Sequence, residues 1–144
     1  MQARITAMLP AIVAELRMAP FQPAKFEMEL VAHGDGAFFA KHIDTFTGIA
    51  DLPAAHRMIS AVYYFFAEPK GFSGGALRLY PLLDANDEAN YRDIEPVSDM
   101  LVCFPSFAPH AVRPIACPSG RFGDSRFAIN NWICRDNAAM ARGG

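Results

Sequence analysis

The chain has 144 residues, of which 52% are hydrophobic and 19% charged, so it can bury the core of one domain and is not expected to be disordered. A net charge of −2 predicts no nucleic-acid surface, and the absence of any run of 18 apolar residues predicts no membrane span. The N-terminus lacks a secretory-signal layout and the three cysteines form no C-x-x-C pair, so we expect a cytoplasmic protein with free thiols.

The first predicted element is a helix over residues 3–18. Apolar residues recur there at spacings of three and four, which places them on one stripe that would pack against a sheet. These residues are Ile5, Met8, Leu9, Ile12, Val13 and Leu16. Pro10 predicts either a kink in one helix or the start of a second short helix, and Pro20 predicts the end of helical structure.

The rest of the chain is predicted to form short strands separated by turns rich in Gly and Pro. The run 58–66 is β-prone and apolar on both faces, so we expect a central, buried strand. Other strands are expected at 26–32, 37–44, 76–80, 100–104, 110–115 and 126–134. One helix followed by seven or eight strands predicts a mainly β, double-sheet fold, a jelly roll or a close relative. We expect a single domain over 1–144, with a helical lead-in at 1–25, a jelly-roll core at 26–135 and a flexible tail at 136–144.

A candidate metal site begins at His42 and Asp44. Two residues apart on a strand, their side chains point to the same face. A second histidine would complete the 2-His-1-carboxylate triad that holds Fe(II) and leaves positions open. His110, 68 residues after His42, is the candidate, because distant strands become neighbours in a jelly roll. Alone, the His-x-Asp pattern is weak, since two solvated polar residues on any strand produce it.

An iron site of this kind needs an electron donor, of which 2-oxoglutarate is the common one. Its distal carboxylate needs a fixed cation, and the planar guanidinium of arginine is the best partner. Arg126 opens the last predicted strand inside an otherwise apolar run, although it could instead face solvent. Tyr63 and Tyr64 lie on opposite faces of their strand, so at most one could donate a second hydrogen bond.

Taken in order, these stretches resemble the prolyl 4-hydroxylase-type branch of the Fe(II)/2-oxoglutarate-dependent dioxygenases. The family pattern is H-x-D, I-Y-Y, S-G-G-x-L-R, I-x-P, H-x-V and R-[YF]-[AS]-[IL]-x-x-W. The matching stretches are His42 to Asp44, Tyr63-Tyr64, Ser73 to Tyr80, Asp93 to Pro96, Pro109 to Val112, and Arg126 to Ile129 with Trp132. Each stretch alone is weak, but their common order is specific, and the resemblance covers residues 26–135.

The resemblance implies His42, Asp44 and His110 as iron ligands and Arg126 as the residue that binds the C5 carboxylate of 2-oxoglutarate. The implied fold is a double-stranded β-helix with helices outside its larger sheet, and segment 3–18 would be one such helix. Retention of Asp44 argues against a halogenating enzyme, in which a small residue at that place opens a halide site.

The resemblance also implies roles for less certain positions. Tyr64 falls where a hydrogen-bonding partner of the C5 carboxylate lies, although a core tyrosine is nearly as good an interpretation. Leu77 would line the co-substrate pocket, and Trp132 would lie near iron or substrate, although we favour a core position for it. The chain departs from the family at Ala111, where a Glu often follows the distal histidine, and near His33, where relatives often carry a tyrosine. His33 itself is predicted to lie at the surface.

The implied activity is hydroxylation of a C–H bond with O2 and 2-oxoglutarate as co-substrates and succinate and CO2 as products. Ascorbate is a candidate for keeping the iron reduced. The target would be a prolyl or other amino-acid side chain, in a protein, a peptide or a small molecule. The alternative is a metal-binding jelly roll without oxygenase activity, serving as a sensor or an interaction domain. Neither nucleic acid nor a membrane is an expected partner, and the sequence leaves the oligomeric state open.

Overall fold

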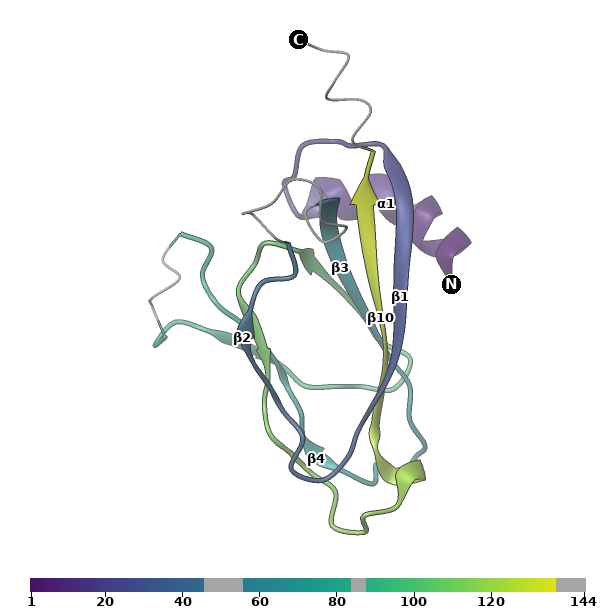
Figure 1. Cartoon of the computed structure of the whole chain (residues 1–144), viewed down its shortest axis with the longest axis vertical. Helices are drawn as coiled ribbons and strands as arrows, with labels where there is room; N and C mark the ends of the chain where they lie inside the picture. Colours follow the sequence, from purple (N-terminus) through teal and green to yellow (C-terminus); the bar gives the residue numbers. More distant parts are fainter. Residues whose placement is uncertain (46–55, 84–87, 137–144) are drawn as a thin grey trace.

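Two antiparallel β-sheets face each other in this computed structural model, which describes residues 1–45, 56–83 and 88–136, and one helix covers the larger sheet (Figure 1). The larger sheet consists of β1 (Pro23–His33), β10 (Arg126–Arg135), β3 (Arg57–Tyr64) and β7 (Leu101–Pro105), in that spatial order. The smaller sheet consists of β2 (Phe39–His42), β8 (His110–Val112), β5 (Leu77–Leu79) and β6 (Arg92–Ile94). A two-stranded sheet of β4 (Ser73–Gly74) and β9 (Ile115–Ala116) and a short 3-10 helix η2 (Phe122–Asp124) complete the described elements. The predicted mainly β, jelly-roll architecture with one N-terminal helix is confirmed.

Helix α1 (Gln2–Glu15) packs on the outer face of the larger sheet. Its buried residues Ile5, Leu9 and Val13 form one cluster with side chains of β3 and β10, which are Ile59, Ala61 and Ile133. The helix continues through Pro10, so no second helix starts there. Met8 is 50% exposed because it lies at the margin of the apolar stripe.

The strand predictions differ from the structure where prolines and turns interrupt pairing. The predicted strand 110–115 is two strands in two different sheets, β8 and β9. Pro114 lies between them and has no N–H with which to continue a ladder. Residues 92–94, where no strand was predicted, form β6 and pair with β5. Strand β3 lies between β10 and β7, as its two apolar faces predicted.

The register of the larger sheet arranges the side chains of its inner face in rows across β1, β10 and β3. Residues opposite each other on antiparallel strands point to the same face. The rows are Glu27–Trp132–Ser60, Glu29–Asn130–Val62, Val31–Ala128–Tyr64, and His33–Arg126. Along the strands, this inner face is therefore most polar at the Glu27 row, mixed at the Glu29 row and mainly apolar at the Val31 row. It ends at the buried Arg126.

Two other findings bear on the sequence predictions. The three cysteines are all free. No helix in the described parts of the chain is long and apolar enough to cross a membrane. Of the predicted tail at 136–144, only Asp136 belongs to the described residues, and residues 46–55 and 84–87 also lie outside them.

Candidate metal centre

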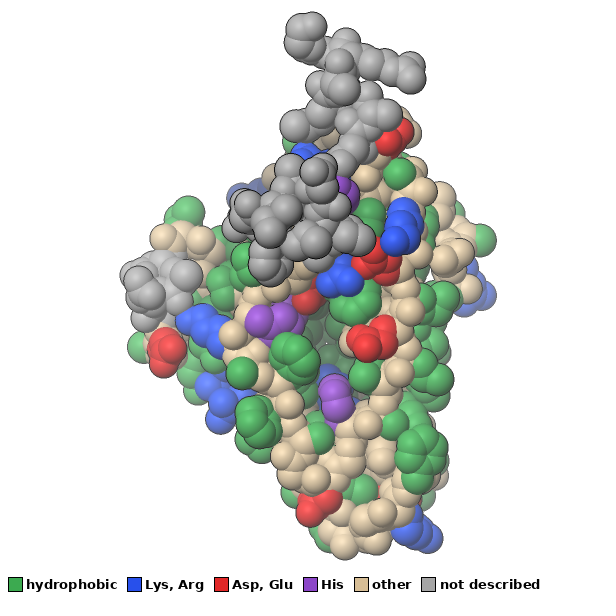
Figure 2. All heavy atoms as spheres, in the orientation of Figure 1, with side chains coloured by type: hydrophobic (Ala, Val, Ile, Leu, Met, Phe, Trp, Pro, Cys, Tyr) green, Lys and Arg blue, Asp and Glu red, His purple; other side chains and the backbone are tan. Residues whose placement is uncertain are grey.

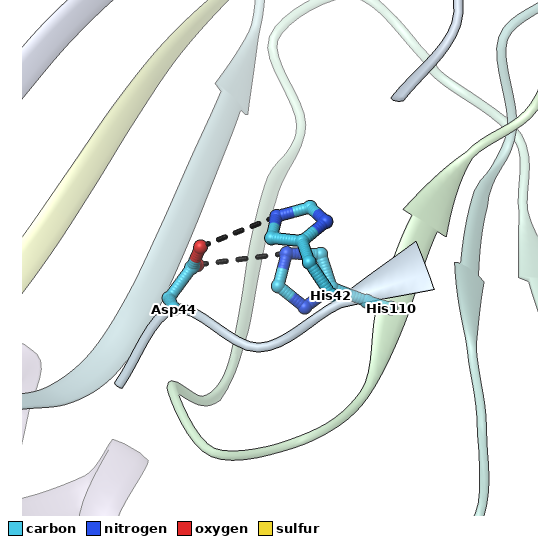
Figure 3. Close-up of side chains that lie close together, drawn as sticks. All are labelled: His42, Asp44 and His110. Atoms are coloured by element: carbon cyan, nitrogen blue, oxygen red, sulfur yellow. Dashed lines mark ion pairs between the residues drawn. The ribbon is translucent and has the colours of Figure 1, made fainter. Parts of the chain in front are cut away.

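The three predicted ligand residues converge at the end of the smaller sheet. His42 ends β2 and pairs with His110, the first residue of β8, so their rings lie 4.2 Å apart between centroids. Asp44 lies two residues past His42 in a bend, and its carboxylate faces both imidazoles (Figure 3). Its Oδ1 is 3.4 Å from Nε2 of His42, and its Oδ2 is 3.5 Å from Nε2 of His110. All three ligand atoms lie within 4.8 Å of one another, a spacing that one metal ion can bridge.

Backbone hydrogen bonds orient both imidazoles. Nδ1 of His42 lies 2.7 Å from the Ala40 carbonyl oxygen, and Nδ1 of His110 lies 2.9 Å from that of Ala108. A carbonyl accepts only, so Nδ1 carries a proton in both rings, and in the neutral form of each ring the Nε2 lone pair is free for a metal. Metal-binding histidines are oriented by hydrogen bonds of this kind. The two Nε2 atoms therefore face the carboxylate with the electron pairs that a metal needs.

Asp44 is held as an anion. Burial alone would raise the pKa of its carboxyl group, but the neighbouring His42, together with His110, Ser60 and Trp132, lowers it to about 2. The Ser60 hydroxyl donates to Oδ2 at 2.6 Å. Two neutral nitrogens and one carboxylate oxygen form a donor set that suits Fe(II).

The bend that carries Asp44 is fixed by Ser106. Its carbonyl oxygen accepts hydrogen bonds from the backbone N–H groups of Asp44 at 2.8 Å and Thr45 at 3.2 Å. Its hydroxyl also lies 3.0 Å from that of Ser60, which holds the carboxylate. Ser106 therefore supports both the backbone and the side chain of this ligand position.

One cavity of about 790 Å³ contains the triad and also every other predicted site residue. Histidine, acidic and hydrophobic side chains surround its opening on the face shown in Figure 2. Leu77 is 2% exposed and lines the wall. Trp132 is only partly buried and lines the cavity wall, so our interpretation of it as a core residue is wrong. The Arg57 guanidinium lies over its ring, 3.9 Å from the ring centroid.

Arg126 lies in the wall of the same cavity and is 2% exposed. Its Nε donates to the Gly75 carbonyl oxygen at 2.9 Å, and its Nη2 donates to the Tyr64 hydroxyl at 3.2 Å. No carboxylate among the described residues forms an ion pair with it. Burial lowers its pKa, while Tyr64 opposes that effect. A buried cation without a counter-ion is costly, so an anionic group of a ligand is the expected partner.

His33 is a site residue that the sequence analysis placed elsewhere. We predicted it at the surface, but it lines the cavity, and its Nδ1 lies 3.2 Å from Nη1 of Arg126. Burial, followed by the charge of Arg126, lowers the pKa of His33, so the ring is neutral and Nδ1 accepts the hydrogen bond. Because the two residues are opposite each other on β1 and β10, only the strand register could have revealed the contact.

Gly75 allows the arginine to lie against the backbone. A Cβ at this position would lie 2.7 Å from Cδ of Arg126 and 2.9 Å from Cγ1 of Ile115, and the backbone φ is +73°. We expect Gly75→Ala to lower the free energy of unfolding by about 2–4 kcal/mol, from left-handed strain and overpacking together. Urea denaturation measures this. The matched control is Gly36→Ala, which has φ +72° and nothing within 4 Å, and should cost only about 1–2 kcal/mol. Equal losses in the two variants would contradict the packing argument.

Comparisons with known proteins agree with this geometry. The sequence profile of the 2OG-Fe(II) oxygenase superfamily matches residues 28–134. An uncharacterized PKHD-type hydroxylase of Synechocystis sp. is 38% identical over 134 residues, covering 90% of this chain, and the chain spans 43% of that protein's length. A Pseudomonas putida prolyl-4-hydroxylase structure superimposes with a TM-score of 0.62 at 29% identity, over 92% of this chain and 63% of that one. A Burkholderia pseudomallei oxidoreductase of the 2OG-Fe(II) oxygenase family shares the fold, with a TM-score of 0.56 at 15% identity, over 78% of this chain and 45% of that one. The chain belongs to the 2OG-Fe(II) oxygenase superfamily.

Proposed function

We propose that this chain is the catalytic domain of a dioxygenase that hydroxylates a C–H bond and converts 2-oxoglutarate to succinate and CO2. One observation carries the proposal. A single cavity contains a His-Asp-His triad and a buried arginine that no carboxylate of the described residues neutralises. A cation site and an anion site in one cavity suit a metal and a dicarboxylate bound together.

In this proposal His42, Asp44 and His110 bind iron through Nε2, a carboxylate oxygen and Nε2. Their orientation by backbone carbonyls and Ser60 supports the assignment, because the donor atoms are held in place before the metal arrives. Bound iron would supply oxygen activation, with electrons from the 2-oxo acid. The protein's own part is to orient the ligands and keep the carboxylate ionised.

Arg126 would bind the C5 carboxylate of 2-oxoglutarate. A guanidinium has five N–H donors, and three of those of Arg126 are engaged by Gly75, Tyr64 and His33. One N–H on each Nη remains for the two oxygens of a carboxylate. The fully buried Tyr64 hydroxyl and the Leu77 side chain would complete this end of the site and exclude water.

The substrate proposal follows the names of the similar proteins. One is called a PKHD-type hydroxylase and another a prolyl-4-hydroxylase, so we propose a prolyl or other amino-acid side chain as the target. Ascorbate is proposed as the reductant that keeps iron in the Fe(II) state. We also propose that residues 1–144 form one domain.

Succinate formation tests the function. Protein loaded anaerobically with Fe(II) is mixed with 2-oxoglutarate and O2, and succinate is measured without added substrate, because slow uncoupled turnover is expected. Asp44→Ala, prepared in the same way, should form none above the level of free iron. A wild-type protein that binds iron and 2-oxoglutarate but forms no succinate would instead be a metal-binding domain without oxygenase activity.

His33→Ala should weaken 2-oxoglutarate binding about 2- to 12-fold, because Arg126 loses one hydrogen-bond partner worth about 0.5–1.5 kcal/mol. Calorimetric titration of Mn(II)-loaded protein with 2-oxoglutarate measures the change. His33→Asn, whose side-chain oxygen can accept the same hydrogen bond, should recover most of the affinity. Leu30→Ala, on the outward face of the same strand, should have no effect. Equal affinity in His33→Ala and wild type would show that the contact does not support the anchor.

A further inference from the structure

The opening of the cavity lies between β1 and β2. Residues that line the cavity and are also exposed mark this opening, and they include Glu29 on β1 and Phe39 with Ile43 on or beside β2. Phe39 is 51% exposed and Ile43 is 41% exposed. The Phe39 ring lies 4.2 Å from the His42 ring, so the opening leads directly to the metal-binding residues. Any substrate that reaches the triad by this opening passes a carboxylate on one side and apolar side chains on the other.

Glu29 differs from Glu27, its neighbour on the same face of β1. Glu27 is neutralised, because its Oε2 lies 2.6 Å from Nη2 of Arg57 and its Oε1 lies 3.0 Å from Nζ of Lys25. Burial alone would raise the pKa of Glu27, but the hydrogen bonds from Lys25 and Arg57 lower it. Glu29 has no ion pair or side-chain hydrogen bond among the described residues. Its cross-strand neighbour Asn130 also lines the cavity and offers an amide beside the carboxylate.

Among the described residues that line the cavity, the charge of Glu29 is not compensated; Lys25, the second partner of Glu27, lies outside the lining. The described lining residues contain three carboxylates (Glu27, Glu29 and Asp44) and two guanidinium groups (Arg57 and Arg126). Neutral histidines leave a net charge of −1, and binding of Fe(II) with the 2-oxoglutarate dianion does not change that total. Glu27 is paired with Arg57, Asp44 faces the metal position, and Arg126 faces the co-substrate position. The remaining negative charge is therefore that of Glu29, at the opening.

We infer that Glu29 selects substrates carrying an ammonium or guanidinium group, separated by an apolar segment from the C–H bond that reacts. The cation would bind at Glu29 and Asn130, while the apolar segment contacts Phe39 and Ile43. Glu29 lies one row from Glu27, Trp132 and Ser60, about 7 Å along the strand, and Ser60 holds the ligand Asp44. The proposed substrates are a lysine- or arginine-like side chain, or a peptide with a basic residue beside the target residue. This inference rests on the proposed function and names the substrate class of the same cavity.

Peptide binding to the loaded but unreactive protein tests the inference. The probes are pools of capped heptapeptides built from Gly, Ala, Ser and Pro, with a central Lys, Arg, norleucine or Glu. Affinities are measured by calorimetry on protein loaded with Mn(II) and 2-oxoglutarate. We expect the Lys or Arg pool to bind about two- to fivefold more tightly than the norleucine pool, and the Glu pool more weakly, because Glu29 is solvent-exposed. Comparing the affinities of the Lys and Arg pools shows whether the site prefers an ammonium or a guanidinium group.

Variants of Glu29 test whether this residue causes the preference for cationic peptides. Glu29→Gln should remove the preference for cationic pools without changing 2-oxoglutarate affinity, and Glu29→Lys should reverse it in favour of the Glu pool. Glu95→Gln, an exposed carboxylate that does not line the cavity, should bind as the wild type does. A wild-type protein without a cationic preference, or a Glu29→Gln variant that keeps it, would overturn the inference. Succinate formation by that same wild-type protein would show that the proposed function stands and only the substrate class is wrong.

Discussion

Replacing Asp44 with alanine should lower the affinity for Fe(II) or Mn(II) by at least about 100-fold. Loss of a residue that only orients a metal ligand lowers metal affinity by about 10–100-fold. Asp44 is itself the proposed anionic ligand, so its loss should cost at least the upper end of that range. The variant leaves two neutral imidazoles without the carboxylate that both of them face at 3.4–3.5 Å. Anaerobic calorimetric titration measures the affinity directly.

Metal-dependent stability gives an independent measurement of the same loss. At a metal concentration 100 times Kd, binding adds about 2.7 kcal/mol to the free energy of unfolding of the wild type. Asp44→Ala should lose this increment while its metal-free form still folds. The control is Asp93→Ala, whose carboxylate pairs with Arg78 at 2.7 Å and does not line the cavity. A wild-type metal affinity in Asp44→Ala would place the metal elsewhere.

Replacing Arg126 with alanine should weaken 2-oxoglutarate binding about 30- to 5,000-fold while leaving metal affinity nearly unchanged. Removing one partner of a buried, hydrogen-bonded charge pair costs about 2–5 kcal/mol, and tenfold in affinity corresponds to about 1.4 kcal/mol. Arg126 is the buried cation in the cavity that has no carboxylate partner among the described residues. The affinity is measured by titrating 2-oxoglutarate into the Mn(II)-loaded variant.

Two further variants separate charge from shape at this position. Arg126→Lys keeps the charge but loses the planar pair of N–H donors, so its affinity should lie between those of alanine and arginine. Arg121→Ala removes an arginine whose side chain is 76% exposed, and should bind 2-oxoglutarate as the wild type does. Since Arg126→Ala also empties a buried position, its folding is checked by circular dichroism. A folded Arg126→Ala protein with unchanged 2-oxoglutarate affinity would show that the carboxylate binds elsewhere.

The proposed substrate preference and the proposed anchor both depend on how charges are distributed in one cavity. Among the described residues, neither Arg126 nor Glu29 forms an ion pair, whereas Glu27 and Arg57 neutralise each other. The cavity therefore offers a cation at its buried end and a carboxylate at its opening. A dicarboxylate inside and a cationic substrate at the opening would satisfy both.

The fold class and the order of the site residues could be predicted from the sequence alone. The stripe at Leu9 and Val13 predicted the packed helix, and the two apolar faces of 58–66 predicted a central strand. These patterns can be recognised because side-chain direction follows the local period of the backbone. His42, Asp44, His110 and Arg126 were found because their types suit one chemistry and their order matches a family.

The contact partners of the site side chains could not be predicted from local sequence patterns and follow from the tertiary structure. His33 contacts Arg126 through the pairing of β1 with β10, and Trp132 lines the cavity although an aromatic residue in an apolar run is usually buried. Glu27 and Glu29 have the same local pattern, yet only Glu27 meets Arg57. The physical reason is that a local period fixes the face on which a side chain lies, whereas its neighbours depend on the register between strands distant in sequence.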